Sequence, residues 1–360
     1  MRASTVLAVG AAGVVAVAAV ASSIRGGGDA ADAPATTAAT ETTPTLTAGA
    51  IPVGDVRRLP EVTAGTYPGR LFAFTSNLCV VVVTDLTTLR VTNPAGVDNA
   101  CTIWPSPANR ALASQPPPPN DAAVRIATVV DGRSTDTGLR YVPGSAPGGL
   151  TVADNGLVAA CYGTSVRLSR DGRVQTVRAF TPVEGVFDER CVTGAVGRRI
   201  VQLGADRKSL VDVTTHRVVR RLASPVAAPV VAITSSPDGM VLIADLADGP
   251  PQGTVFGRSG NIVMTRTPIA RGVSIRKLAL ARDGIAVAVQ SSRGWEITNL
   301  LSHATLAAPG RARVDDVAFS PDGDAVALAT ENGVVFANVS DLTPRALLNA
   351  SYQALAWLPG

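Results

Sequence analysis

Lysine, histidine and aromatic residues are scarce in this chain of 360 residues. It has only two lysines, Lys208 and Lys277, and two histidines, His216 and His303, and aromatic residues make up 4%. Charged residues make up 17%, and the formal net charge is +4. Nucleic-acid binding proteins usually carry a clustered, strongly basic field, so this mild charge argues against nucleic acid as a partner. Arginine supplies nearly all of the 32 cationic residues, a bias typical of GC-rich genomes.

The N-terminus lacks charged residues between Arg2 and Arg25 and is rich in Val, Ala and Gly. This pattern predicts a secretory signal peptide or a membrane anchor over residues 1–25. Ala19-Val20-Ala21 fits a small-residue cleavage site, and retention as an anchor stays open. No cysteine precedes Cys79, which excludes a lipoprotein signal. In either case we expect the bulk of the chain to be exported to the periplasm or cell envelope, close to the membrane.

Large apolar residues are almost missing from residues 26–54, which consist mainly of Ala, Thr, Gly and Pro. Such a segment buries too little apolar surface to offset its ordering entropy, so we expect a disordered tether. Its composition suits an O-glycosylated stalk as well as a plain spacer.

The cysteines show no CxxC spacing, and only two histidines are present. Structural zinc sites usually need such ligands, so the sequence predicts no cofactor, and a metal stays unknown. The four cysteines are Cys79, Cys101, Cys161 and Cys191. An even number in an exported chain predicts two disulfides. Three pairings are possible, and Cys79–Cys101 with Cys161–Cys191 closes the shortest loops.

Short apolar runs separated by Gly-containing turns recur along the rest of the chain. Ser236-Pro237-Asp238-Gly239 and Ser320-Pro321-Asp322-Gly323 are the clearest copies. Proline presets φ, aspartate accepts hydrogen bonds within the turn, and glycine adopts the left-handed conformation. Four short strands per repeat, at intervals of about 36 to 50 residues, are typical of β-propellers. Repetition favours a structural joint over a binding loop, because a ligand rarely needs every copy.

Six complete units begin near Cys101, Gly149, Glu189, Pro229, Ile275 and Val314. A seventh is split, because the strands near residues 70–93 lack an inner strand and Tyr352–Gly360 supplies one at the other end of the chain. Residues 55–360 therefore resemble the seven-bladed β-propellers of the bacterial exported YVTN, TolB-like or WD40-like repeat type. The resemblance implies an all-β, seven-bladed β-propeller, monomeric, closed by pairing of the C-terminal strand with the N-terminal blade. The Trp-Asp ending of WD40 repeats is missing, so the fold implies no activity.

One unit concentrates positive charge. Residues 185–221 hold eight cationic and four acidic residues, and this difference of +4 equals the formal net charge of the whole chain. Arginine forks suit carboxylate and phosphate groups, so we expect this unit to be a docking surface. The predicted binding residues, expected on neighbouring strands, are Arg198, Arg199, Arg217, Arg220 and Arg221. A solvated face enriched in arginine by codon usage is the alternative.

Two functional classes remain open. The first is a non-catalytic extracytoplasmic scaffold that binds a protein or an anionic envelope component. The second is a lactonase-like propeller hydrolase with a metal in the central channel, which normally needs several inward carboxylate, Asn or His side chains. Asp315 and Asp316 precede an inner strand and offer a cation site there, or are ordinary loop carboxylates. We predict no catalytic residue, and the enzyme class is the less favoured.

Individual aromatic and loop residues also allow two interpretations. Trp104, Phe319 and Trp357 share one position at the end of an inner strand, which favours packing between blades over a sugar-stacking platform. Trp295 is expected to be a lone surface aromatic, and both histidines to be solvated. The run Gln115–Asn120 contains four prolines and predicts a stiff protruding loop, as a ledge for a partner or as a detour.

Overall fold

The structure is a computed structural model. It describes residues 47–50, 56–75, 80–93, 102–115, 124–130, 133–141, 150–162, 165–178, 191–227, 229–247, 249–271, 275–291, 293–307 and 313–360. The chain divides into two compact units, Met1–Thr42 and Thr43–Gly360, and every described residue belongs to the second. The predicted signal or anchor, Cys79, Cys101 and the four prolines after Gln115 lie outside the described residues. Within them, no helix has the length and apolar character needed to cross a membrane.

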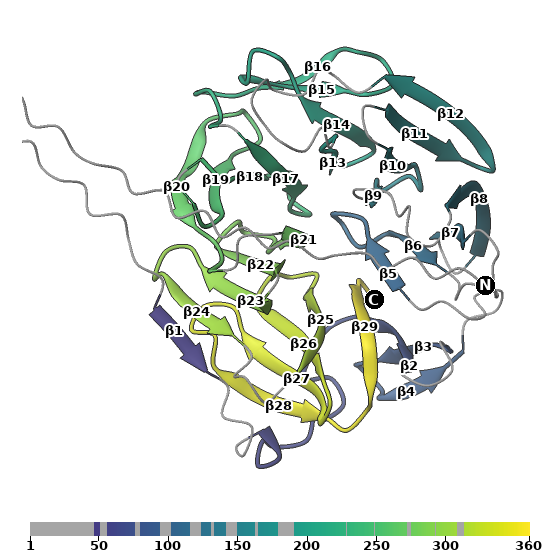
Figure 1. Cartoon of the computed structure of the whole chain (residues 1–360). Helices are drawn as coiled ribbons and strands as arrows, with labels where there is room; N and C mark the ends of the chain where they lie inside the picture. The colour runs from purple at the N-terminus through teal and green to yellow at the C-terminus, as the bar shows by residue number, and fades with distance from the viewer. Residues whose placement is uncertain are drawn as a thin grey trace, which may run out of the picture. The chain divides into compact units, whose positions relative to one another are not determined.

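Seven antiparallel four-stranded blades, one of which is extended by a fifth strand, form a propeller around a central channel (Figure 1). In every blade the first strand named is the innermost and the last is the outermost. Blade 1 contains β29 (Tyr352–Leu358), β2 (Arg70–Thr75), β3 (Val81–Asp85) and β4 (Arg90–Thr92). Blade 2 contains β5 (Thr102–Pro105), β6 (Ala111–Gln115), β7 (Val124–Val130) and β8 (Arg133–Tyr141). Blade 3 contains β9 (Leu150–Val152), β10 (Val158–Tyr162), β11 (Ser165–Arg170) and β12 (Arg173–Arg178).

The remaining blades follow in chain order. Blade 4 contains β13 (Gly194–Val196), β14 (Arg199–Leu203), β15 (Ser209–Asp212) and β16 (Val218–Arg221). Blade 5 contains β17 (Val230–Ser235), β18 (Val241–Asp245), β19 (Gln252–Phe256) and β20 (Ile262–Pro268). Blade 6 contains β21 (Ile275–Leu280), β22 (Ala286–Ser291), β23 (Gly294–Asn299) and β24 (Ala304–Ala307). Blade 7 contains β25 (Val314–Phe319), β26 (Ala325–Thr330), β27 (Gly333–Asn338) and β28 (Pro344–Leu348).

The ring closes as the sequence predicted. The C-terminal strand β29 pairs antiparallel with β2, with Trp357 opposite Leu71 and Ala354 opposite Phe74. Figure 1 shows this yellow strand beside the blue strands of blade 1. Trp357 is fully buried, packs edge-on against Tyr67 and Phe336, and donates its indole N–H to Pro68 O. The all-β, seven-bladed prediction and the closure by the C-terminal strand are both confirmed.

The turns between first and second strands are joints, as their repetition indicated. Blades 2 to 7 each place one residue with positive φ in this turn, and these are Asn109, Gly156, Gly197, Gly239, Gly284 and Gly323. In the Ser-Pro turns the serine side chain adds hydrogen bonds, because Ser320 Oγ accepts from the Ala325 amide and Ser236 Oγ from the Met240 amide. Turns of neighbouring blades also touch, since Asp154 Oδ1 of blade 3 accepts from the Ala108 amide of blade 2.

Both histidines lie in turns between third and fourth strands. His216 (φ 56°) and His303 (φ 55°) take the same left-handed backbone conformation as Leu89 and Leu342 in the equivalent turns. Histidine tolerates this conformation better than most side chains. We therefore assign both histidines a role in chain reversal.

Trp295 is a correction to the sequence-based expectation. It is 3% exposed and packs in the apolar layer between blades 6 and 7, and its indole N–H donates to Asp315 O. Its strand β23 is buried on both faces because neighbouring blades cover both sides of a propeller sheet. Trp295 is thus a packing residue, and the prediction that it is an isolated surface aromatic is wrong.

Four consecutive inner strands contain an extra residue near their start. The pairing register shifts between Val230 and Ala232 in β17 and at the corresponding positions of β21, β25 and β29. The extra residues are Val231, Arg276, Asp315 and Gln353. The described inner strands of blades 2, 3 and 4 pair without such a shift. Because a bulge redirects the side chains beside it, these four strands present a different set of side chains to the channel.

Four residues of the predicted tether differ from the expectation of disorder. Thr47–Ala50 form β1, which pairs in parallel with β24 at the outer edge of blade 6. The chain then bridges to blade 7, where the Val62 amide donates to Leu347 O and the Leu347 amide donates to Pro60 O. Covering an outer strand in this way reduces the unpaired backbone that an edge exposes.

Candidate binding sites on blade 4 and in the channel

Blade 4 separates the five predicted binding arginines into two groups. Its strand order is β13-β14-β15-β16, so β15 lies between the strand of Arg199 and the strand of Arg220 and Arg221. The expectation that these arginines project from neighbouring strands is therefore wrong. Arg198 precedes β14 and Arg199 begins it, and Arg217 precedes β16 at the same end of the sheet, where Arg217 O accepts from the Asp212 amide. Arg221 lies at the opposite end, across from Ser209.

Arg198, Arg199 and Arg217 form what we call the basic turn face. All three are exposed, and no ion pair within the described residues involves them. The described acidic residues of the blade are used by its own turns instead. Asp212 accepts from the Thr214 and Thr215 amides, and Asp206 accepts from the Lys208 amide. Within the described residues of blade 4, the positive charge of the basic turn face is therefore not neutralised.

Arg220 has a structural contact as well as a charge. It is partly buried, and its Nη1 donates to Gly257 O in the turn of blade 5. Burial, and then the nearby Arg258, lower the pKa of Arg220. Arg221 is exposed and contributes to the lowered pKa of Asp206, whose main cause is the hydrogen bond from the Lys208 amide.

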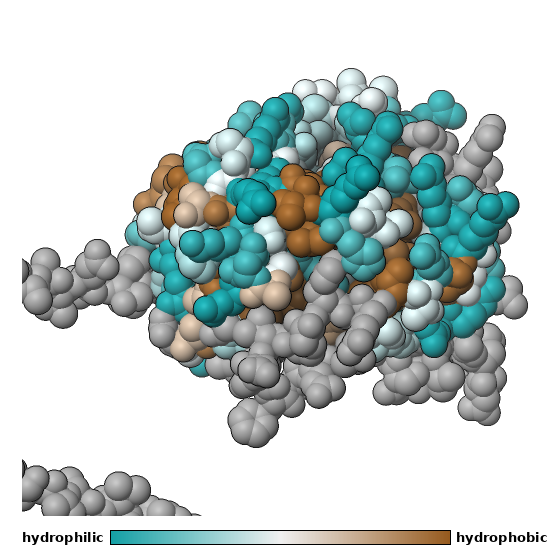
Figure 2. Space-filling view, turned by 90° about the horizontal axis from the view of Figure 1, so that it is seen from above, coloured by the Kyte–Doolittle hydropathy of each residue, from teal (hydrophilic) through white to brown (hydrophobic). Residues whose placement is uncertain are grey.

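The rim beside these arginines mixes hydrophilic and apolar side chains. Figure 2 looks at the molecule from the side that lies at the top of Figure 1, where β12 and β16 run, and shows hydrophilic residues around hydrophobic ones. Val218 on β16 and Val263 on β20 are among the exposed large hydrophobic residues. Surfaces that combine arginine with apolar side chains are common in protein interfaces.

The central channel contains a cavity of about 510 Å³ lined by residues from all seven inner strands. Its walls are unequal. The inner strands β25 and β29 are buried along most of their length, whereas β17 and β21 leave most of their side chains half-buried. Trp104, at the position it shares with the buried Phe319 and Trp357, is also half-buried and lines the cavity. Packing between blades is therefore confirmed for Phe319 and Trp357, and Trp104 has a second environment.

An ion pair between two neighbouring blades lines the cavity, and we call it the channel ion pair. Lys277 Nζ of β21 lies 3.2 Å from each carboxylate oxygen of Asp316 on β25, and 3.4 Å from Ile103 O of β5. The Leu355 amide of β29 also donates to Asp316, so this cluster joins blades 6, 7, 1 and 2. Burial raises the pKa of Asp316, while the Lys277 ammonium and the Leu355 amide lower it in part.

Asp316 was a candidate from the sequence, whereas Lys277 was missed. The signal was available, because Lys277 is one of only two lysines and lies one position after an inner-strand bulge, as Asp316 does. Asp315, the other predicted cation ligand, pairs with Arg313 at 2.6 Å. Both carboxylates are thus paired with cationic side chains. In the part of the chain that the structure describes, no three His, Cys, Asp or Glu side chains group as a metal site would require.

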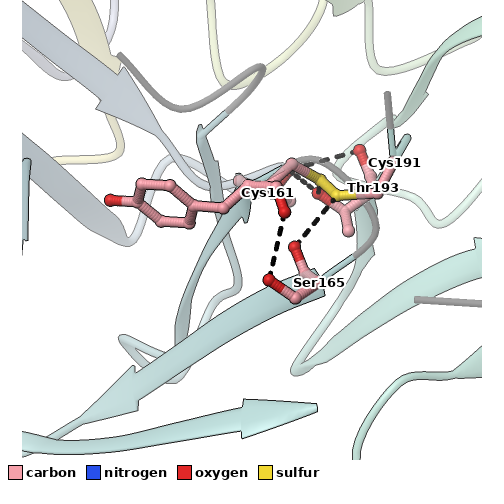
Figure 3. The surroundings of a disulfide bond; sticks show 6 residues. Cys161, Ser165, Cys191 and Thr193 are labelled. Atoms are coloured by element: carbon pink, nitrogen blue, oxygen red, sulfur yellow. Dashed lines mark hydrogen bonds between the residues drawn. A yellow bond between two sulfur atoms is a disulfide. The ribbon is translucent and has the colours of Figure 1, made fainter. Parts of the chain in front are cut away.

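A disulfide joins blade 3 to the start of blade 4 (Figure 3). It links Cys161 on β10 to Cys191, whose Cα atoms are 5.6 Å apart, and so confirms one of the two pairings with the shortest loops. The Thr193 hydroxyl lies 3.8 Å from the Cys161 sulfur and 2.8 Å from the Thr151 hydroxyl. Cys191 lines the channel cavity. The Cys79–Cys101 pairing stays a prediction.

Comparisons with known proteins concern the fold. No protein-family model and no curated protein sequence matches this chain. Similar solved structures include TolB from Acinetobacter baumannii, with 15% identity over 82% of this chain and 68% of TolB and a TM-score of 0.46. Apo AztD from Citrobacter koseri has 12% identity over 80% of this chain and 97% of AztD, with a TM-score of 0.47. The β-propeller domain of Cps50 (Swd1) from Myceliophteria thermophila has 19% identity over 74% of this chain and 93% of that domain, with a TM-score of 0.44.

The predicted resemblance to seven-bladed β-propellers is confirmed by the order and pairing of the strands. Identities this low transfer neither ligand nor partner, because one propeller architecture serves many unrelated functions.

Proposed function

We propose that this protein is an exported, non-catalytic β-propeller scaffold that binds an anionic partner through blade 4. The partner is an acidic protein or an anionic component of the cell envelope. The observation that carries the proposal is the basic turn face, where Arg198, Arg199 and Arg217 are exposed without an ion pair among the described residues. Arginine in this state is free to form paired hydrogen bonds with carboxylate or phosphate groups.

Blades 5 to 7 provide the contrast that supports this proposal. Three of their acidic side chains pair with arginines, namely Asp245 with Arg266, Glu296 with Arg271, and Asp341 with Arg345. If arginine were only a product of codon usage, the same neutralisation would be expected in blade 4. Its two described carboxylates accept from turn amides instead. The charge of the basic turn face is thus better suited to a partner than to the fold.

Two observations support an extracytoplasmic location. The Cys161–Cys191 disulfide is typical of oxidising compartments outside the cytoplasm. The uncharged stretch between Arg2 and Arg25 is typical of a signal or anchor. The tether then keeps the propeller near the membrane, where anionic headgroups, envelope polymers and acidic proteins are concentrated.

Charge reversal tests the site. The variant Arg198→Glu/Arg199→Glu/Arg217→Glu is compared with the parent for retention on bacterial envelope fractions at increasing salt. We expect salt-sensitive retention by the parent and its loss in the variant, because like charges would face the partner. Protease treatment of the fractions separates an acidic protein from a polymer or lipid. Arg220 is kept in this variant, since its bond to Gly257 O supports the fold.

The matched control is Arg90→Glu/Arg173→Glu/Arg293→Glu. These arginines are also exposed, and they lie on blades 1, 3 and 6. Because both variants replace three arginines with glutamate, the net charge changes equally. Equal loss in both variants would mean that total charge, and not blade 4, governs retention. Turnover of a lactone or phosphoester panel by the metal-supplemented protein would contradict the non-catalytic part of the proposal.

A further inference from the structure

The channel cavity has an apolar wall that the protein covers only in part. Val230 and Val231 of β17 and Ile275 and Leu278 of β21 all line the cavity and are half-buried. We call these four residues the apolar wall. The next two inner strands of the ring, β25 and β29, bury most of their side chains. Exposed apolar surface that is gathered in a concave site commonly marks a ligand site.

The charge of the cavity is positive by one unit. Its charged lining residues among those described are Arg276, Lys277 and Asp316. Lys277 and Asp316 neutralise each other in the channel ion pair. Arg276 is exposed and is in no ion pair within the described residues. It is also the extra residue of the β21 bulge, and bulges often serve to aim one side chain at a functional site.

The apolar wall and the single surplus positive charge together indicate the chemical class of the ligand. A cation would meet net positive charge, and a polyanion would find one surplus cation only. A fully polar sugar would leave the apolar wall in contact with polar groups. An organic acid with one carboxylate and an apolar body matches both the wall and the charge. The volume of about 510 Å³ falls in the range of small-molecule sites, roughly 300–1,000 Å³.

We propose that the channel cavity binds an amphipathic monoanion, with its apolar body against the apolar wall and its carboxylate paired with Arg276. This site is separate from the basic turn face and does not depend on the function proposed for it. Trp104 and Trp295 both line the cavity, but Trp104 is half-buried, whereas Trp295 is 3% exposed and Trp357 is fully buried in the packing between blades. Ligand binding should therefore change the fluorescence of Trp104 more than that of the two buried tryptophans.

The test uses three probes that share one twelve-carbon alkyl chain and differ in the head group, namely dodecanoate, dodecanol and dodecylammonium. Each is used below its micelle concentration. Binding to the full chain is measured by calorimetry and by tryptophan fluorescence, with Trp104→Phe identifying the reporter. We expect saturable binding of one dodecanoate and affinities lower by about tenfold or more for the other two, because a charge-assisted contact is lost. Absence of saturable dodecanoate binding, or equal binding of dodecanol, would overturn the proposal.

Two variants locate the site. Arg276→Gln should weaken dodecanoate binding about tenfold or more, whereas Arg293→Gln, an exposed arginine on the same blade, should not change it. Ala279→Phe fills the cavity beside the apolar wall and should abolish binding, provided its thermal melt matches the parent. If Ala279→Phe does not fold, the comparison of Arg276→Gln with Arg293→Gln decides the question. Equal dodecanoate affinities of these two variants would place the binding site elsewhere. The basic turn face variant should bind dodecanoate normally, and Arg276→Gln should keep envelope retention, so failure of one proposal leaves the other testable.

Discussion

Blades 7 and 1 bury a charged and an aromatic side chain, whereas blade 4 leaves charged side chains exposed. In blades 7 and 1, Asp316 is 2% exposed and held by Lys277 and the Leu355 amide, and Trp357 is fully buried between Tyr67 and Phe336. In blade 4 the strands are short, and three arginines of the basic turn face lie exposed without an ion pair among the described residues.

This difference separates charge that serves the fold from charge that is available to a partner. A buried carboxylate needs a partner inside the protein, because an isolated buried charge is very costly. An exposed guanidinium remains hydrated and contributes little to stability. Substitutions of the buried residues in blades 7 and 1 should therefore change stability, and substitutions on the basic turn face should change binding.

The largest effect is expected from deletion of Tyr352–Gly360. The deletion removes β29, the whole inner strand of blade 1, and exposes the backbone of β2 and the apolar layers on both sides. The loss of Trp357 alone is worth about 3–5 kcal/mol, against a typical total stability of about 5–15 kcal/mol. We expect loss of cooperative urea unfolding. A truncated protein that unfolds like the parent would show that ring closure contributes little, and the contrast between the two regions would fail.

The next effect is expected from Asp316→Ala. It leaves the Lys277 ammonium in the channel without its carboxylate, which should lower the unfolding free energy by about 3–5 kcal/mol. Urea denaturation measures the change. The matched variant is Lys277→Met/Asp316→Leu, which removes both charges and should recover most of the loss. If the single and double variants are equally destabilised, lost packing, and not an unpaired charge, explains the effect.

Removal of the Cys161–Cys191 disulfide should have an effect of similar or slightly smaller size. The bond closes a loop with a sequence separation of 30, which corresponds to about 3–4 kcal/mol in the chain-entropy estimate. Cys161→Ser/Cys191→Ser is compared with the parent by thermal unfolding, and peptide mapping of the unreduced parent identifies the bond. A map that joined Cys161 to another cysteine would contradict the pairing.

The smallest stability effect is expected for the basic turn face. Arg198→Glu/Arg199→Glu/Arg217→Glu should change the unfolding free energy by less than about 0.5 kcal/mol per site, because these side chains are exposed and unpaired. The measurement is the same urea titration that is used for Asp316→Ala. A loss of unfolding free energy as large as that of Asp316→Ala would show that the arginines stabilise the fold, and blade 4 would then no longer differ from blades 7 and 1.

Much of the fold was predictable because its signals are local. Each inner turn needs a left-handed residue, and Gly239, Gly284 and Gly323 stand where the repeat places them. The match of Tyr352–Gly360 to an inner strand predicted the closure that pairs β29 with β2. Trp295 was misassigned because periodicity does not reveal that neighbouring blades cover both faces of a strand.

The candidate sites were less predictable, because they depend on which strands become neighbours. The sequence showed the charge excess of residues 185–221, but only the strand order separated Arg199 from Arg221 by β15. It also contained both Lys277 and Asp316, 39 positions apart, without any sign that they meet.

The sequence by itself determined the number of blades, the positions of their turns, the closing strand and the residues that carry the excess charge. These follow from turn chemistry and strand alternation, which act over a few residues. The tertiary structure alone decided which charges are buried and which side of the channel is filled. Lys277 and Asp316 meet because bulges in β21 and β25 shift the register at equivalent positions, and the channel stays open beside β17 and β21 because the packing of seven separate sheets sets how far their inner strands approach one another.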